Sequence, residues 1–175
     1  SMRQHTQTLW RLVNDGGLRV GVINVPRTYP PPQVNGYLVS GMLTPPTARD
    51  FTYPAELCDE LEQVVGRYQI EPQTRYRDPS AQQYLDDLRG MLHSEIQAAL
   101  YLFDTYPTDL FIKVFTFTDR LLHHTWKYID PNSAQYDHAF HDQAIDLLHL
   151  LDTFLAEIRH RLKDDSSLII MSDHG

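Results

Sequence analysis

The sequence contains little cysteine, few basic residues and no long apolar run, and each shortage excludes a class of protein. The single cysteine, Cys58, rules out an intrachain disulfide and a cysteine-based zinc cluster, and it fits a reducing compartment. Fifteen basic residues against 23 acidic ones give a formal net charge of −8. This balance argues against duplex nucleic acid or an anionic membrane as a partner. The sequence shows no transmembrane segment and no signal peptide, which favours a cytoplasmic location.

The length and composition are typical of a single globular domain. The chain has 175 residues, of which 42% are hydrophobic and 22% are charged. This is enough for one core and too little for two ordinary domains. Residues 1–2, Ser-Met, are typical of a cloning scar, so we assign the domain to residues 3–175 and expect the natural amino terminus to lie elsewhere.

Apolar periodicity predicts an alternation of helices and strands. Amphipathic patterns predict helices over residues 7–14, 54–66, 80–104 and 132–163. Apolar, β-branched runs predict buried strands over residues 18–25, 109–118 and 168–171. The proline-rich stretch 26–46 is expected to form a shaped loop, and residues 67–79 a connection.

Two pairs of potential metal ligands follow two of these predicted strands. Asp119 and His123 are spaced four apart in DRLLH, and Asp173 and His174 lie in the terminal SDHG. A right-handed strand–helix–strand crossover from residue 109 to residue 171 would bring both pairs to one edge of a parallel sheet. Carboxylate and imidazole groups gathered there suit a divalent metal. The alternative is that Asp119 only caps a helix and that His123 is incidental.

Three segments, in this order, resemble a known family. NVPRTYPPPQVNGYLVSGMLTP, FTFTDRLLHHTWKYID and LIIMSDHG are similar to the type I phosphodiesterase/nucleotide pyrophosphatase family of the alkaline phosphatase superfamily. The resemblance implies a three-layer α/β fold with a mostly parallel sheet and long flanking helices, present here as a partial, alkaline-phosphatase-like domain. Residues 44–107 would form a helical cap over the site.

The resemblance also implies a chemistry. In this family two divalent metals, commonly zinc, with manganese or magnesium as alternatives, clamp the oxygens of a phosphoryl group. Asp119 and His123 would bind one metal, and Asp173 and His174 the other. The substrate would be a nucleotide or another small phosphodiester. The chain departs from the family pattern because no threonine or serine occupies the place of the nucleophile. Each metal would keep only two protein ligands, so we expect the chain to be inactive and its metal binding to be weak.

Other residues invite functional interpretations that the sequence favours less. Arg27 could meet a phosphate but is expected to form an ordinary salt bridge, and Cys58 is expected to pack. His124 should face solvent or pack locally. Trp126 and Tyr128 should cover the metal edge or pack in the core, with stacking on a base as the alternative. A second group of potential metal ligands is formed by His138, His141, Asp142 and His149. We interpret it as the solvated polar face of an amphipathic helix.

The sequence is also compatible with several other functions. A phosphomonoesterase, sulfatase or phosphonate hydrolase would share the metal core and differ in its substrate pocket. A non-catalytic binding or structural module would keep the motifs without the activity. An incomplete parallel sheet would expose an edge or an apolar face, so we also predict self-association of the chain or a locally rearranged core.

Overall fold

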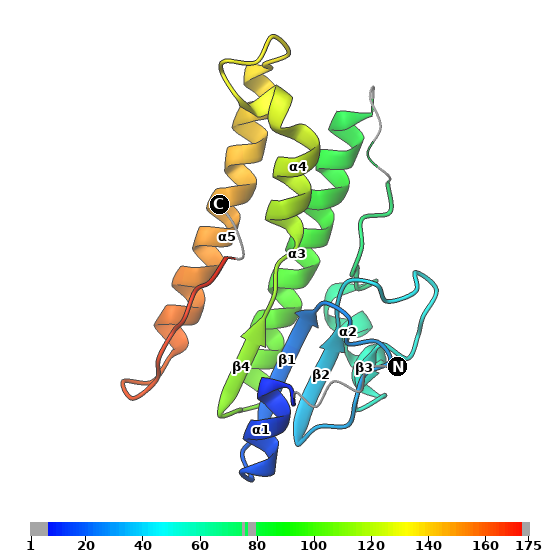
Figure 1. Ribbon diagram of the computed structural model, residues 1–175, viewed down its shortest axis with the longest axis vertical. Helices are drawn as coiled ribbons and strands as arrows, with labels where there is room; N and C mark the ends of the chain where they lie inside the picture. Colours follow the sequence, from blue (N-terminus) through cyan, green and yellow to red (C-terminus); the bar gives the residue numbers. More distant parts are fainter. Residues whose placement is uncertain (1–6, 75, 77–79, 173–175) are drawn as a thin grey trace.

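The computed structural model describes residues 7–74, 76 and 80–172 and shows an α/β fold (Figure 1). The elements in chain order are α1 (Leu9–Asp15), β1 (Val20–Val25), β2 (Gly36–Ser40), β3 (Thr52–Tyr53), α2 (Leu57–Val65), α3 (Ala81–Thr105), β4 (Leu110–Lys113), α4 (Phe117–Ile129) and α5 (His138–Arg161).

The sheet has the strand order β3-β2-β1-β4 and is mostly parallel. Strand β1 pairs in parallel with β2 on one side and with β4 on the other, and only the short β3 is antiparallel to its neighbour. Gly21 lies opposite Tyr37, and a Cβ atom at Gly21 would come within 2.5 Å of the Tyr37 ring. Glycine at this position therefore makes room for a buried aromatic side chain.

Helices cover both faces of the sheet. On one face, Val20, Val22 and Leu38 are buried against Trp10 and Val13 of α1. On the other face, Ile23, Tyr37 and Val39 join the larger core, to which α2, α3, α4 and α5 contribute. The predicted three-layer α/β architecture with long flanking helices is therefore confirmed.

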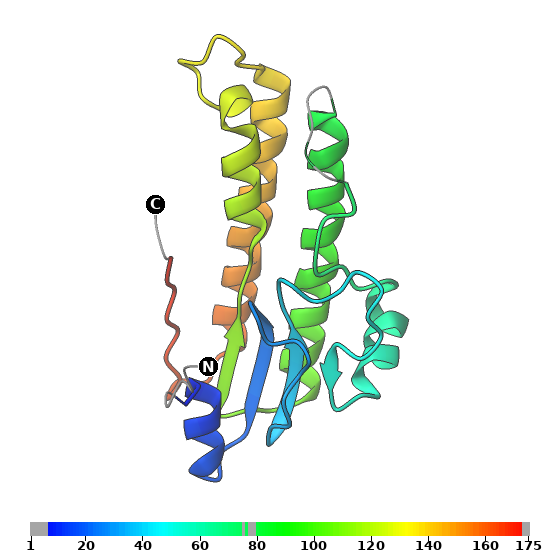
Figure 2. The same cartoon turned by 45° about the vertical axis from the view of Figure 1, so that its right-hand side comes forward.

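The long helices continue past the carboxyl end of the sheet. Figures 1 and 2 show α3, α4 and α5 rising beyond β1 and β4, and these three helices contact one another. Because α4 begins shortly after β4 ends, its first turns lie close to the edge at which parallel sheets bind ligands. No helix among the described residues has the length and apolarity needed to span a bilayer.

The predicted strand over residues 168–171 is wrong. These residues have no regular structure, and Ile169, Ile170 and Met171 are 76%, 67% and 87% exposed. In Figures 1 and 2 this segment runs in the direction of β4, on its outer side, without joining it. An apolar run reports only a local preference, whereas a strand also needs backbone hydrogen bonds from a distant partner.

The strand predicted over residues 109–118 is shorter than expected and lies at the edge of the described sheet. The strand ends at Lys113, although the apolar run continues beyond it. Phe117, in the later part of this run, is the first residue of α4, and its side chain is fully buried. The helix predicted from residue 132 starts at His138, where the Asp137 carboxylate accepts a hydrogen bond from the Phe140 amide at 3.1 Å. Asp137 is thus the N-cap that sets this boundary.

Candidate metal and phosphate site

Asp119 and His123 lie on the first two turns of α4. The helical spacing places them on one face, and His123 Nε2 lies 3.1 Å from Asp119 Oδ1. Their side chains are 56% and 64% exposed, respectively. A metal ion in solvent could therefore reach a carboxylate oxygen and an imidazole nitrogen that already lie next to each other.

The second predicted pair, Asp173 and His174, lies outside the described residues. The crossover that would place it beside Asp119 depended on a strand at 168–171, which the structure does not contain. Within the part of the chain that the structure describes, no group of three or more His, Cys, Asp or Glu side chains is arranged to hold a metal. The meeting of the two pairs stays a prediction.

A buried ion pair lies at the carboxyl end of β4. Lys113 Nζ is 2.7 Å from Glu95 Oε2 of α3, and the two side chains are only 4% and 1% exposed. The same ammonium donates hydrogen bonds to the Val114 carbonyl at 3.0 Å and to Asn24 Oδ1 at 2.8 Å. Burial raises the pKa of Glu95 and lowers that of Lys113, and each partner's charge opposes the shift. The three acceptors satisfy the ammonium, so the pair connects α3, β4 and β1.

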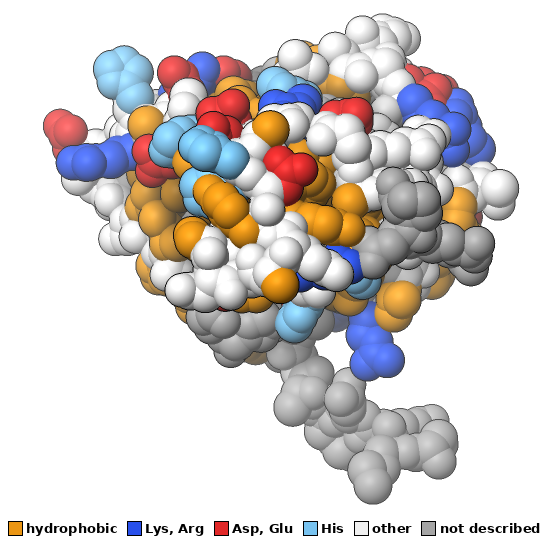
Figure 3. All heavy atoms as spheres, turned by 90° about the horizontal axis from the view of Figure 1, so that it is seen from above, with side chains coloured by type: hydrophobic (Ala, Val, Ile, Leu, Met, Phe, Trp, Pro, Cys, Tyr) orange, Lys and Arg blue, Asp and Glu red, His pale blue; other side chains and the backbone are white. Residues whose placement is uncertain are grey.

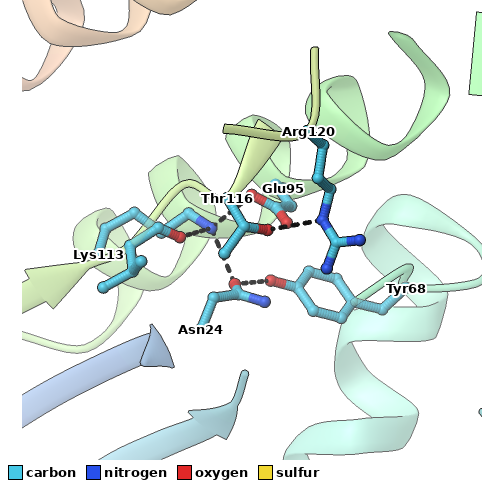
Figure 4. A network of polar contacts seen from close by, with 7 residues as sticks. Asn24, Tyr68, Glu95, Lys113, Thr116 and Arg120 are labelled. Atoms are coloured by element: carbon cyan, nitrogen blue, oxygen red, sulfur yellow. Dashed lines mark hydrogen bonds and ion pairs between the residues drawn. The ribbon is translucent and has the colours of Figure 1, made fainter. Parts of the chain in front are cut away.

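Asn24 is the member of this network that belongs to the central strand. It sits at an irregularity in the β1–β2 register, and its φ is 60°. Asparagine tolerates this left-handed conformation better than most residues, and a bulge of this kind redirects a side chain. The Asn24 side-chain oxygen accepts hydrogen bonds from the Tyr68 hydroxyl and from Lys113 (Figure 4).

Arg120 extends the polar network to the first turn of α4. Its Nε donates to Thr116 Oγ1 at 3.3 Å, and one of its terminal nitrogens pairs with the Glu71 carboxylate. Figure 4 shows Arg120 with its hydrogen bond to Thr116, and its charge is close enough to Glu95 to oppose the rise that burial causes in the pKa of that carboxyl. The residue directly after Asp119 is thus anchored, which restrains the start of the helix that carries Asp119 and His123.

This network was not predicted from the sequence. A signal was present, because Asn24 and Lys113 each interrupt an apolar run, in VINVP and LFIKVF. A polar residue inside a buried strand needs a partner, but the sequence does not reveal which distant residue supplies it.

The remaining candidates have mostly packing roles. His124 stacks on Tyr76, with ring centroids 5.1 Å apart, and Tyr128 packs on Phe140 at 5.2 Å. Cys58 is buried, which raises the pKa of its thiol. Trp126 is exposed.

Two further predictions concern charged side chains, at the start of α5 and in the segment after β1. Both His138 and His141 pair with Asp142, at 3.0 and 3.2 Å, on the exposed start of α5. Arg27 forms no ion pair with any described residue, so the expected salt bridge is not found there. With Trp10, Pro30 and Pro32 it lines a cavity of about 350 Å³.

The surface at the far end of the long helices carries mixed charges. Figure 3 shows acidic, basic and histidine side chains interspersed there, with apolar surface between them. Such a surface lacks the single-sign character that attracts nucleic acid.

The fold and the α4 pair define an α/β protein with a carboxylate and an imidazole exposed near the carboxyl edge of a parallel sheet. A model of the type I phosphodiesterase / nucleotide pyrophosphatase family matches residues 2–175. The chain belongs to this family, as its motifs predicted, and the family hydrolyses phosphodiester bonds. No curated protein and no solved structure matches the chain significantly.

Proposed function

We propose that this chain contributes to a metal-dependent phosphodiesterase or nucleotide pyrophosphatase, with Asp119 and His123 as ligands of one divalent metal. Asp173 and His174 are proposed to bind a second metal. The nucleophile expected of the family, a threonine or serine, is assigned to no residue of this chain. The substrate class is a nucleotide or another small phosphodiester.

The observation that carries the proposal is the exposed contact between Asp119 and His123. The 3.1 Å distance between the carboxylate oxygen and the imidazole nitrogen supports a shared ion, and the exposure of the two side chains leaves both atoms open to solvent. A structural ion pair of the same protein, Lys113–Glu95, is by contrast enclosed. Accessible ligand atoms are what a site for exchangeable ions requires.

The donor set fits zinc as part of a coordination sphere. Zinc binds carboxylate oxygen and imidazole nitrogen, and catalytic sites use three protein ligands with one open position. A metal held there would supply Lewis-acid stabilisation of the phosphoryl oxygens. The chain's own contribution is orientation, because Arg120 ties the first turn of α4 to Thr116 and Glu71.

Zinc titration by calorimetry tests this proposal. We expect wild-type chain to bind zinc, Asp119→Asn and His123→Ala to lose at least about tenfold in affinity, and Asp173→Asn to weaken binding further in combination. The chain offers a matched control in Asp142, whose carboxylate is 60% exposed and lies 3.0 Å from His138 at the same helical spacing.

The control separates a specific site from incidental chelation. If Asp142→Asn lowers zinc affinity and Asp119→Asn does not, the assignment of Asp119 is wrong. If no variant changes the affinity, the motifs are remnants in a non-catalytic module.

A further inference from the structure

The side-chain amide of Asn24 is oriented by its neighbours so that its nitrogen has no acceptor among the described residues. The oxygen accepts from the Tyr68 hydroxyl and from Lys113 Nζ, as Figure 4 shows. An ammonium group has no acceptor, so the amide cannot be reversed without placing its NH₂ against Lys113. The hydrogen bonds therefore fix which end of the amide is the donor.

The Asn24 nitrogen donates to none of the described residues, although the residue is only 3% exposed. Within the described part of the chain, the side-chain atoms that are fully enclosed and lack a partner are Tyr37 Oη and Ser94 Oγ. The Asn24 nitrogen is not one of them, so it keeps a small opening to solvent. A donor with so little access to solvent and no acceptor among the described residues costs free energy, and it is free to donate to a ligand that reaches it.

The position of Asn24 indicates the kind of acceptor. It lies at the carboxyl end of the central parallel strand, where α/β proteins bind their ligands, and on a bulge that aims the side chain. The Lys113 ammonium lies 2.8 Å from the Asn24 oxygen, and the charge of Arg120 reaches Glu95 of the same network. A neutral donor close to cationic side chains suits an anionic oxygen.

We propose that the Asn24 side-chain amide donates a hydrogen bond to a phosphoryl oxygen of the ligand, held in place by Lys113 and Tyr68. Asn24 is then a binding residue, and Lys113 and Tyr68 are positioning residues. The identity of the anion as a phosphoryl group rests on the proposed function. The orientation of the amide does not depend on it.

Asn24→Asp is the decisive substitution. A carboxylate still accepts from Lys113 and Tyr68, and aspartate tolerates the same backbone conformation, but it presents an oxygen where the amide presented a donor. Inorganic phosphate is the probe, titrated by calorimetry with and without zinc. We expect Asn24→Asp to lower phosphate affinity at least about tenfold. Asn132→Asp makes the same change of charge at an exposed turn and should leave the affinity unchanged.

A second measurement needs no variant. In ¹⁵N-edited spectra of the wild-type chain, phosphate should shift the Asn24 side-chain NH₂ resonances and leave those of Asn132 in place. Absence of this shift, absence of saturable binding at millimolar phosphate, or equal affinity in Asn24→Asp would each overturn the inference.

The two proposals can fail separately. If Asn24-dependent phosphate binding persists while zinc does not bind, the Asn24 assignment stands and the metal assignment is wrong. If zinc binds through Asp119 and Asn24→Asp leaves phosphate affinity unchanged, the metal assignment stands and the Asn24 assignment is wrong.

Discussion

The Lys113–Glu95 pair and the Asp119–His123 pair lie on either side of the connection from β4 to α4, and only the second is exposed. Lys113 and Glu95 are 4% and 1% exposed, and the Lys113 ammonium has further hydrogen-bond partners in the core. Asp119 and His123 are more than half exposed. The first pair holds elements together, whereas the second leaves its carboxylate and imidazole atoms open to solvent. Burial thus separates a structural pair from one whose atoms a solute can reach.

The largest expected effect comes from breaking the buried pair. Lys113→Ala should lower the free energy of unfolding by about 3–5 kcal/mol, because it leaves the Glu95 carboxylate buried without its counter-charge. Urea denaturation followed by circular dichroism measures this change. The double variant Lys113→Met, Glu95→Leu should recover most of the loss. A loss below about 1 kcal/mol in Lys113→Ala would mean that the pair does not hold these elements together.

A much smaller effect is expected at the exposed pair. Asp119→Asn should change the free energy of unfolding by less than about 1 kcal/mol, because solvent screens an exposed pair and either partner can be hydrated. The same denaturation experiment, run beside Lys113→Ala, checks this. A loss as large as that of Lys113→Ala would make Asp119 a structural residue.

The contrast between the two pairs also shows what the sequence could predict. The helices α1, α2, α3 and α5 and the strands β1 and β4 follow from local apolar patterns, and the motif around Asp119 indicated the α4 pair. The prediction of a loop over residues 26–46 is wrong at Gly36–Ser40, which form β2, and α4 was predicted only as one helical turn. The partner of Lys113 could not be predicted, because Glu95 lies on another element and only the tertiary fold brings the two together. The strand expected at residues 168–171 failed for the same reason, since its pairing depends on a distant edge.

The smallest effect concerns His138, which is exposed. A hydrogen bond with its own backbone, followed by the charge of Asp142, raises the pKa of His138 above its ordinary value of 6.5. Because folding raises the pKa of His138, the protonated imidazole stabilises the folded state. This stabilisation is fully present below pH 6.5 and is lost as the pH rises through the folded-state pKa.

Histidine titration by NMR checks this prediction. Asp142→Asn should lower the pKa of His138, and Asp119→Asn should leave it unchanged. An unchanged His138 pKa in Asp142→Asn would show that the carboxylate contributes nothing to the shift.

The most direct test of the central claim is a crystal structure of the zinc-loaded chain, with the metal located by anomalous scattering. We expect zinc bonded to an Asp119 carboxylate oxygen and to His123 Nε2, each at about 2.0–2.2 Å. Zinc found instead between His138 and Asp142, or at neither pair, would contradict it.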